Sequence, residues 1–206
     1  MDSRLPPDSR IDPPALPELR LVLLGRKGAG KSAAGNTILG GVGGFESGKP
    51  TEECVKRRAD VAGRRVTVVD TPGWEWYYPL NSTPNWVRRE TLRSVSLCPP
   101  GPHAVLLVVR SCASITEDCI SEIEEHLGPL GKGVWEHAVL LFTRGDELGL
   151  ASMEDLRGLL EKCRGRYHVI SSFNQRLKDV GDKMLRQEDE LKNMREREVK
   201  RMRWFF

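Results

Sequence analysis

The feature that most constrains this chain is a glycine-rich octapeptide directly after a short apolar run. Leu19–Leu24 reads Leu-Arg-Leu-Val-Leu-Leu, and the next residues are Gly25-Arg-Lys-Gly-Ala-Gly-Lys-Ser32. An apolar run of this length is typical of a strand that is buried on both faces. A strand, a Gly-x-x-x-x-Gly-Lys-Ser turn and a helix, in this order, predict a loop that binds phosphate groups. The alternative is a glycine-rich turn with an incidental Gly-Lys-Ser.

Each residue type in this loop has a role in the predicted phosphate site. Glycine at positions 25, 28 and 30 lets successive backbone N–H groups curve around a phosphate. We expect the Lys31 ammonium to lie between the β- and γ-phosphates and to neutralise transition-state charge, and the Ser32 hydroxyl to be a direct Mg²⁺ ligand. The predicted nucleotide contacts in the loop are Gly25, Arg26, Lys27, Gly28, Ala29, Gly30, Lys31, Ser32 and Ala33.

Two further segments supply the rest of the predicted magnesium and γ-phosphate site. The apolar run 66–70 ends in Asp70, which we expect to hold Mg²⁺ through water, and the Gly73 N–H is expected to face the γ-phosphate. The alternative for Asp70-Thr-Pro-Gly is a proline turn at a strand end. In the glycine-rich loop before this run, Thr51 is the best-placed hydroxyl to complete the Mg²⁺ shell, and Ser47 is a candidate nucleotide contact. For both side chains the alternative is a solvated loop position.

The choice of base depends on the turn after the apolar run 138–143. Guanine presents two adjacent N–H donors that one carboxylate accepts, so Asp146 predicts guanine. Thr143 is expected to hold the turn through side-chain-to-backbone hydrogen bonds, and Arg144 to lie over the base. Asp146 as the N-cap of the next helix is the alternative, and Ser171 and Ser172 either contact the guanine or cap a helix. The nucleotide contacts predicted here are Thr143, Arg144, Gly145, Asp146 and Ser171.

Apolar runs and helical patterns alternate along the chain. Strands are expected at 19–24, 66–70, 103–109, 138–143 and 167–170, and helices at 31–39, 84–95, 116–127 and 152–163. This alternation predicts a three-layer α/β fold with a mainly parallel sheet and helices on both faces. Residues 1–18, which contain five prolines, are expected to be a disordered leader. Residues 19–174 then form the folded domain, and residues 175–206 a charged helical extension.

Composition excludes several classes of protein. The 206 residues include 32 Lys and Arg and 29 Asp and Glu, and this net charge of +3 argues against nucleic acid as a partner. The apolar runs fall short of the roughly 18–20 residues of a transmembrane helix, and the N-terminus lacks the pattern of a signal peptide. The five cysteines are odd in number and scattered, and they include no Cys-x-x-Cys pair. This pattern is typical of a protein whose thiols stay reduced. We therefore expect a cytoplasmic protein.

Taken together, these segments resemble the GTPases of the immunity-associated family (GIMAP), in the septin-like and Toc-like branch of P-loop GTPases. The resemblance runs from about Leu19 to Asn174, and its most specific stretch is Pro99-Pro-Gly-Pro-His103-Ala-Val-Leu-Leu-Val-Val. It implies a domain that binds GTP and GDP with Mg²⁺ and, in the GTP state, forms a homodimer or oligomer or pairs with a related GTPase. The basic and aromatic tail, 195–206, is either a solvated helix or a peripheral contact with an organelle membrane.

Hydrolysis is expected to be slow or absent. Trp74 follows Gly73, where Ras-like enzymes carry a glutamine that orients the attacking water. The arginine that hydrolytic members of the resembled family use across a dimer falls at Ser114 or Ile115. We therefore expect a GTP-dependent switch or scaffold. The alternative is a GTPase activated by dimerisation through a residue supplied in trans, for which Arg110 is the candidate. The structural interpretation of Arg110 is a plain surface arginine or one in a local ion pair.

Two groups of side chains have both a functional and a structural interpretation. His103 either reaches the nucleotide of a dimer partner or completes the loop into its strand. The aromatic cluster either forms a partner surface or packs on the neighbouring helix; it comprises Trp74, Trp76, Tyr77, Tyr78 and Trp86. The heptad spacing of Leu177, Met184 and Leu191 is a weak coiled-coil pattern.

Overall fold

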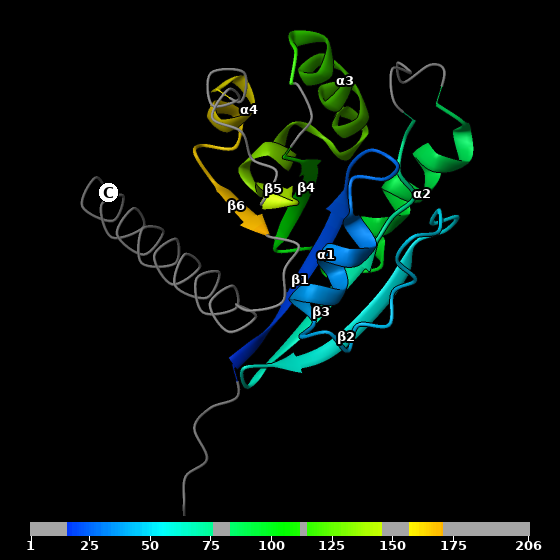
Figure 1. The fold of residues 1–206 in the computed structure, drawn as a ribbon, viewed down its shortest axis with the longest axis vertical. Helices are drawn as coiled ribbons and strands as arrows, with labels where there is room; N and C mark the ends of the chain where they lie inside the picture. The colour runs from blue at the N-terminus through cyan, green and yellow to red at the C-terminus, as the bar shows by residue number, and fades with distance from the viewer. Residues whose placement is uncertain (1–15, 76–82, 112–114, 146–156, 171–206) are drawn as a thin grey trace, which may run out of the picture.

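The computed structural model describes residues 16–75, 83–111, 115–145 and 157–170, which form a six-stranded sheet flanked by helices (Figure 1). The strands are β1 (Leu16–Leu24), β2 (Val55–Val61), β3 (Arg64–Asp70), β4 (Ala104–Arg110), β5 (Ala138–Thr143) and β6 (Tyr167–Ile170). The helices are α1 (Lys31–Ile38), α2 (Asn85–Ser96), α3 (Glu117–Leu127) and α4 (Arg157–Lys162), with 3-10 turns η2 (Gly128–Leu130) and η3 (Lys132–Glu136).

The sheet is mainly parallel, with the strand order β2-β3-β1-β4-β5-β6. β1 pairs in parallel with β3 and with β4, β4 pairs in parallel with β5, and β5 with β6, whereas β2 runs antiparallel to β3. The carboxyl ends of β1, β3, β4 and β5 therefore meet at one edge, where an α/β sheet places its ligands. This arrangement confirms the predicted α/β fold.

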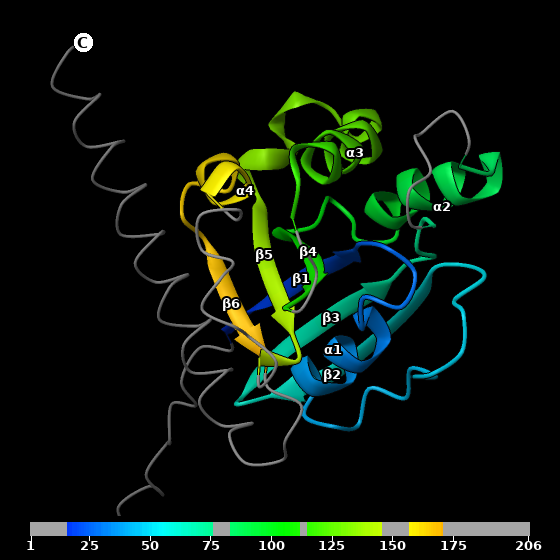
Figure 2. The ribbon, with the colours of Figure 1, turned by 45° about the horizontal axis from the view of Figure 1, so that its top comes forward.

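Helices cover both faces of the sheet because the central strands are apolar on both sides. On β1, Val22 and Leu24 pack with α3 and α4 in one core cluster, while Leu21 and Leu23 pack with α1 in the other. All four side chains are at most 1% exposed. Figure 2 shows α1 on one side of the sheet and α3 and α4 on the other. The continuous apolar run of β1 thus reflects burial on two faces.

The sequence did not predict the edge strand β2. It reads Val-Lys-Arg-Arg-Ala-Asp-Val, and charged residues of this kind are common on edge strands, where they discourage pairing with other chains. A two-residue turn of Ala62 and Gly63 joins it to β3, with φ angles of 51° and 77°. Positive φ at both turn residues matches the twist of a hairpin, but only Gly63 is of a residue type that favours this angle, so the sequence carries little signal for the turn.

The boundaries of the other elements differ slightly from those expected. β1 begins at Leu16, so residues 16–18 belong to the sheet and not to the predicted leader. The reason is local: the Arg64 side chain donates a hydrogen bond of 2.7 Å to the Pro17 carbonyl, and the Thr67 hydroxyl donates to Glu18. α3 begins after Thr116, whose hydroxyl accepts a hydrogen bond from the Cys119 N–H. Residues 1–15 and the predicted extension 175–206 lie outside the described residues.

Among the helices that the structure describes, none has the length and apolar character that a membrane-spanning segment needs.

Candidate functional site

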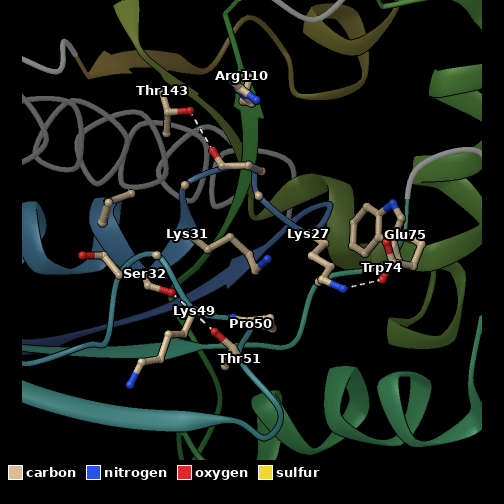
Figure 3. Close-up of a pocket in the computed structure, with 18 of the residues that line it drawn as sticks. Lys27, Lys31, Ser32, Lys49, Pro50, Thr51, Trp74, Glu75, Arg110 and Thr143 are labelled. Atoms are coloured by element: carbon tan, nitrogen blue, oxygen red, sulfur yellow. Dashed lines mark hydrogen bonds and ion pairs between the residues drawn. The ribbon is translucent and has the colours of Figure 1, made fainter.

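The glycine-rich loop connects the carboxyl end of β1 to α1 at the edge where the parallel strands end (Figure 3). Gly25 has a φ of 153°, and a Cβ there would lie 2.4 Å from the carbonyl oxygen of Val108 on β4. No larger residue fits, because that oxygen belongs to the backbone of the sheet. Gly25 thus lets the loop turn tightly over the sheet.

Lys31 is buried under this loop. Its Nζ donates hydrogen bonds of 3.2 Å to the Gly25 carbonyl and 3.1 Å to the Arg26 carbonyl, and the residue is 5% exposed. Burial lowers the pKa of Lys31 to about 8, although the nearby Asp70 carboxylate favours the charged form. An ammonium with so little compensation would gain strongly from an anion in the cleft.

Ser32, Thr51 and Asp70, the three predicted Mg²⁺ ligands, lie together. Asp70 Oδ2 accepts hydrogen bonds of 2.7 Å from the Ser32 hydroxyl and 3.1 Å from the Thr51 hydroxyl. The two hydroxyl oxygens are 3.4 Å apart, and Figure 3 shows the Ser32 and Thr51 side chains joined. Asp70 is 2% exposed, and its Oδ1 has no hydrogen-bond partner among the described residues. Burial raises the pKa of this carboxyl, against the opposing effects of the Ser32 hydrogen bond and the Lys31 charge.

These oxygen atoms fit a hard cation. Mg²⁺ prefers hydroxyl and carboxylate oxygens, usually keeping several waters, and an unpartnered buried carboxylate oxygen is costly unless something pairs with it. Asp70 Oδ1 is such an atom. The residues present therefore suit the ion that the sequence predicts.

The segment after β3 runs directly against the glycine-rich loop. The Lys27 N–H donates a hydrogen bond of 2.7 Å to the Trp74 carbonyl. A Cβ at Gly73 would lie 2.5 Å from the Lys27 nitrogen and 2.6 Å from Lys31 Nζ. Glycine at position 73 is therefore needed for the two segments to approach, and it brings the Gly73 backbone beside the two lysines of the loop.

Three side-chain contacts that the sequence did not reveal hold these segments. Arg26 forms a two-pronged ion pair with Glu122 of α3, Nε to Oε1 at 3.0 Å and the second nitrogen to Oε2 at 2.5 Å. Lys27 Nζ donates to Glu75 at 2.7 Å. The Trp74 ring stacks on His126 of α3, with centroids 4.3 Å apart.

Thr143, at the end of β5, joins the predicted base-binding turn to the glycine-rich loop. Its hydroxyl donates a hydrogen bond of 2.7 Å to the Ala29 carbonyl, and its own carbonyl accepts from Ser111, from the N–H at 3.0 Å and from the hydroxyl at 2.7 Å. Arg144 follows with a φ of 56°. Ser111 is a further residue that sequence reasoning missed. Asp146, Ser171 and Ser172 lie outside the described residues.

A cleft of about 890 Å³ opens above these groups. Gly25 and Arg26 are not among its lining residues, because Gly25 packs on β4 and Arg26 turns to α3; Gly145 and the buried Asp70 do not line it either. Arg110, at the end of β4, lines it, and Arg110 Nε is buried without a hydrogen-bond partner in the described part of the chain. The predicted contacts that do line it are Lys27, Gly28, Ala29, Gly30, Lys31, Ser32, Ala33, Ser47, Thr51, Gly73, Thr143 and Arg144.

His103 and Trp74 follow their structural interpretations. His103 precedes β4, at the edge opposite the cleft; its Nδ1 accepts from the Arg20 N–H at 2.9 Å, and its N–H donates to the Arg20 carbonyl at 2.8 Å. These contacts hold His103 in the loop that leads into β4, as its structural interpretation expects. Trp74 is 2% exposed and packs on α3, whereas Trp86 is 42% exposed and lines the cleft. Trp76, Tyr77 and Tyr78 lie outside the described residues.

Residues 19–201 of the chain match the sequence model of the AIG1 family. The chain belongs to the AIG1 family. It is 35% identical over 158 residues to GTPase IMAP family member 8 of Mus musculus, covering 72% of this chain and 22% of that protein. It is 34% identical over 165 residues to immune-associated nucleotide-binding protein 13 of Arabidopsis thaliana, covering 78% of this chain and 47% of that protein. The chain thus spans less than half the length of these relatives, and the resemblance to immunity-associated GTPases is confirmed.

Solved structures with the same fold are GTPases of the Toc and Era types. Toc33 of Arabidopsis thaliana in complex with Mg²⁺ and GMPPNP has a TM-score of 0.59 at 16% identity, over 77% of this chain and 72% of that one. A second solved structure comes from the chloroplast translocon components atToc33 and psToc159, for whose GTPase activity dimerisation is described as important. Its TM-score is 0.53 at 21% identity, over 71% of this chain and 61% of that one. Era of Aquifex aeolicus bound to GDP.AlF4− gives 0.57 at 15% identity, over 82% of this chain and 56% of that one. The predicted three-layer P-loop GTPase fold is thereby confirmed.

Proposed function

We propose that this AIG1-family chain is a guanine-nucleotide-binding domain that uses Mg²⁺ and acts as a GTP-dependent switch or scaffold, with slow or no hydrolysis. One observation carries the proposal: the Ser32 and Thr51 hydroxyls converge on Asp70 Oδ2 beside a buried lysine, Lys31. The relatives named as GTPases and nucleotide-binding proteins, and a Toc33 structure that contains Mg²⁺ and GMPPNP, support it.

Each of these groups has a part in holding the nucleotide. Backbone N–H groups of Gly28 and of residues 30–33 would bind the phosphates, and the Lys31 ammonium would neutralise their charge. The Ser32 and Thr51 hydroxyls would hold Mg²⁺ directly and Asp70 would hold it through water. When bound, the ion supplies positive charge to the β- and γ-phosphates.

Guanine as the base rests on Asp146. This carboxylate follows β5 by three residues in sequence, and Thr143 at the strand end is tied to the loop through the Ala29 carbonyl. That contact supports a base-binding turn next to the phosphate site. Discrimination against adenine is the part of the proposal that depends on this residue alone.

Slow hydrolysis and assembly complete the proposal. The Trp74 ring is stacked on His126 and 2% exposed, so its indole N–H is buried and the residue after Gly73 has no carboxamide to orient a water. The reported importance of dimerisation for translocon GTPases supports pairing of this domain with a second copy or a related GTPase. The same proposal includes a cytoplasmic location or peripheral membrane attachment through residues 195–206. The basic and aromatic residues of that segment support the attachment.

A second candidate function is a GTPase activated by dimerisation. Arg110 favours it, because this arginine lines the cleft and its buried Nε is without a hydrogen-bond partner within the described ranges. Its guanidinium carries the charge that an arginine finger supplies to developing phosphate charge, and pairing of two domains across their clefts would bring it to the partner's nucleotide.

Nucleotide binding is the experiment that tests the proposal. Titration with fluorescent GDP, with unlabelled GDP and ADP as competitors, should show displacement by GDP alone, and EDTA should weaken binding. Ser32→Ala should remove most of the Mg²⁺ dependence, whereas Ser96→Ala, which removes an exposed hydroxyl on α2, should not. Equal competition by ADP would overturn the guanine assignment.

Single-turnover hydrolysis of GTP over a range of protein concentrations separates the two candidate functions. A low rate that does not change with concentration supports the switch. A rate that rises with concentration and is lost in Arg110→Ala supports the dimer-activated enzyme.

A further inference from the structure

The Lys27–Glu75 ion pair spans the phosphate end of the cleft. Lys27 is the third residue of the glycine-rich loop, Glu75 is the second residue after Gly73, and both line the cleft. Lys27 Nζ lies 2.7 Å from Glu75 Oε1, and Figure 3 shows the two side chains joined across the loop. The pair therefore connects the phosphate loop to the segment that the sequence assigns to the γ-phosphate.

The backbone around this pair marks where a terminal phosphate would lie. A Cβ at Gly73 would lie 2.5 Å from the backbone nitrogen of Lys27 and 2.6 Å from Lys31 Nζ. This side of Gly73 therefore faces both lysines. Lys31 is the residue that neutralises phosphate charge in loops of this kind. The Lys27 backbone thus lies beside the predicted γ-phosphate position, and its four-carbon side chain starts from there.

Lys27 is free to exchange its partner, unlike its neighbour Arg26. Both side chains of the Lys27–Glu75 pair are 49% exposed, whereas those of Arg26 and Glu122 are 13% and 9% exposed. A half-exposed ion pair contributes little net stability because water solvates both partners and two long side chains lose freedom. A lysine on a flexible four-carbon stem can therefore turn to a stronger anion at small cost.

We propose that Lys27 and Glu75 form a charge switch that distinguishes a nucleoside triphosphate from a diphosphate. With the diphosphate, the Lys27 ammonium stays on Glu75. With the triphosphate, it moves to the terminal phosphate and Glu75 is released. This inference rests on the proposed function, since it assigns a role to two residues of the same cleft.

Glu75 sets the balance of this switch. Its carboxylate competes with the terminal phosphate for Lys27 and, being negative and close to the same position, also repels that phosphate. Loss of the acid should therefore favour the triphosphate, and loss of the lysine should disfavour it. The diphosphate does not reach this position, so its affinity should change little in either variant.

Direct binding of GDP and of GMPPNP, each with Mg²⁺, tests the switch. We expect Lys27→Met to lower GMPPNP affinity about tenfold, the value of one charge-assisted contact, with GDP affinity within twofold of the unsubstituted protein. Glu75→Gln should raise GMPPNP affinity severalfold at unchanged GDP affinity. Lys27→Arg should restore most of the preference, since it keeps the charge.

Lys162→Met is the matched control. Lys162 also pairs with a glutamate, Glu124, at side-chain exposures of 38% and 41%, but the pair joins α4 to α3 and is not among the residues lining the cleft. Its loss removes the same charge and should leave the ratio of the two affinities unchanged.

The outcomes separate the switch from the proposed function. Tight binding of both nucleotides together with an unchanged ratio in Lys27→Met would overturn the switch and leave the proposed function standing. Failure of the unsubstituted protein to bind either nucleotide would overturn both. An unfolded Lys27→Met is identified by circular dichroism, and in that case the ratio in Glu75→Gln decides: a selective gain for GMPPNP supports the switch, and an unchanged ratio overturns it.

Discussion

The Thr143 hydroxyl donates a hydrogen bond of 2.7 Å to the carbonyl oxygen of Ala29, which lies 114 residues earlier in the chain. Through this contact the end of β5 fixes the middle of the glycine-rich loop. Thr143 is 8% exposed, so water cannot easily replace the bond. The end of β5 and the glycine-rich loop are thus tied together by a buried hydrogen bond.

Replacement of Thr143 by valine tests this connection. The Ala29 carbonyl would lose its side-chain donor, and we expect the free energy of unfolding to fall by about 1–2 kcal/mol. We also expect nucleotide affinity to fall by about tenfold, because the loop would no longer be held in its binding conformation. Urea denaturation and nucleotide titration measure the two effects. Thr143→Ser keeps the hydroxyl and should retain most of both; an equal loss in the serine variant would contradict the role of the hydrogen bond.

Gly73→Ala tests the close approach of two backbone segments. The added methyl would lie 2.5 Å from the Lys27 nitrogen and 2.6 Å from Lys31 Nζ, so one segment must move. We expect a loss of about 1–3 kcal/mol in the free energy of unfolding, together with weaker GMPPNP binding. Gly101→Ala is the control, since a Cβ there meets nothing within 4 Å. Retention of full GMPPNP affinity in Gly73→Ala would show that the backbone at 73 does not face the terminal phosphate.

The fold and the framework of the site could be predicted because both depend on local signals. Asp70 and Thr143 each close an apolar run, and parallel strands bring such ends to one edge of a sheet. That logic places Asp70 near Ser32, and the structure puts these two side chains 2.7 Å apart. β2 was missed because its charged side chains hide the alternation of an edge strand.

The long-range charge pairs could not be predicted from the sequence. Glu75 and Glu122 lie 48 and 96 residues from their partners, Lys27 and Arg26, and a single glutamate on a loop or helix carries no periodic signal. Only the packing of α3 against the loop decides which arginine meets Glu122. The sequence predicts a nucleotide contact for Arg26, whereas in the structure Glu122 holds the Arg26 side chain against α3.

The Arg26–Glu122 pair should be a major support of the glycine-rich loop. Glu122→Ala removes two hydrogen bonds and the opposite charge from a largely buried arginine, so we expect it to cost about 3 kcal/mol in the free energy of unfolding. Glu124→Ala is the control on the same helix: this side chain is 41% exposed, and its loss should cost less than about 1 kcal/mol. Urea denaturation of both variants checks the difference. Equal costs would show that burial does not strengthen the Arg26 contact.

Lys31 should impose a pH dependence on the stability of the nucleotide-free protein. Burial lowers the pKa of Lys31 from its ordinary value of 10.5 to about 8 in the folded protein. Between these two values the unfolded chain binds more protons than the folded protein. The free energy of unfolding should therefore rise as the pH increases above about 8.

Nucleotide affinity should have the opposite pH dependence. Phosphate groups restore the charge of Lys31, so the complex binds more protons than the free protein and affinity should fall as the pH rises above about 8, by at most about tenfold per pH unit. Both measurements should be made below pH 9. Burial raises the pKa of the Cys54 and Cys163 thiols in the folded protein, so at higher pH these thiols ionise first in the unfolded chain, which would lower the free energy of unfolding. Lys31→Met should abolish the rise in stability. If the free energy of unfolding rises equally with pH in the unsubstituted protein and in Lys31→Met between pH 7.5 and 9, the titration belongs to another group.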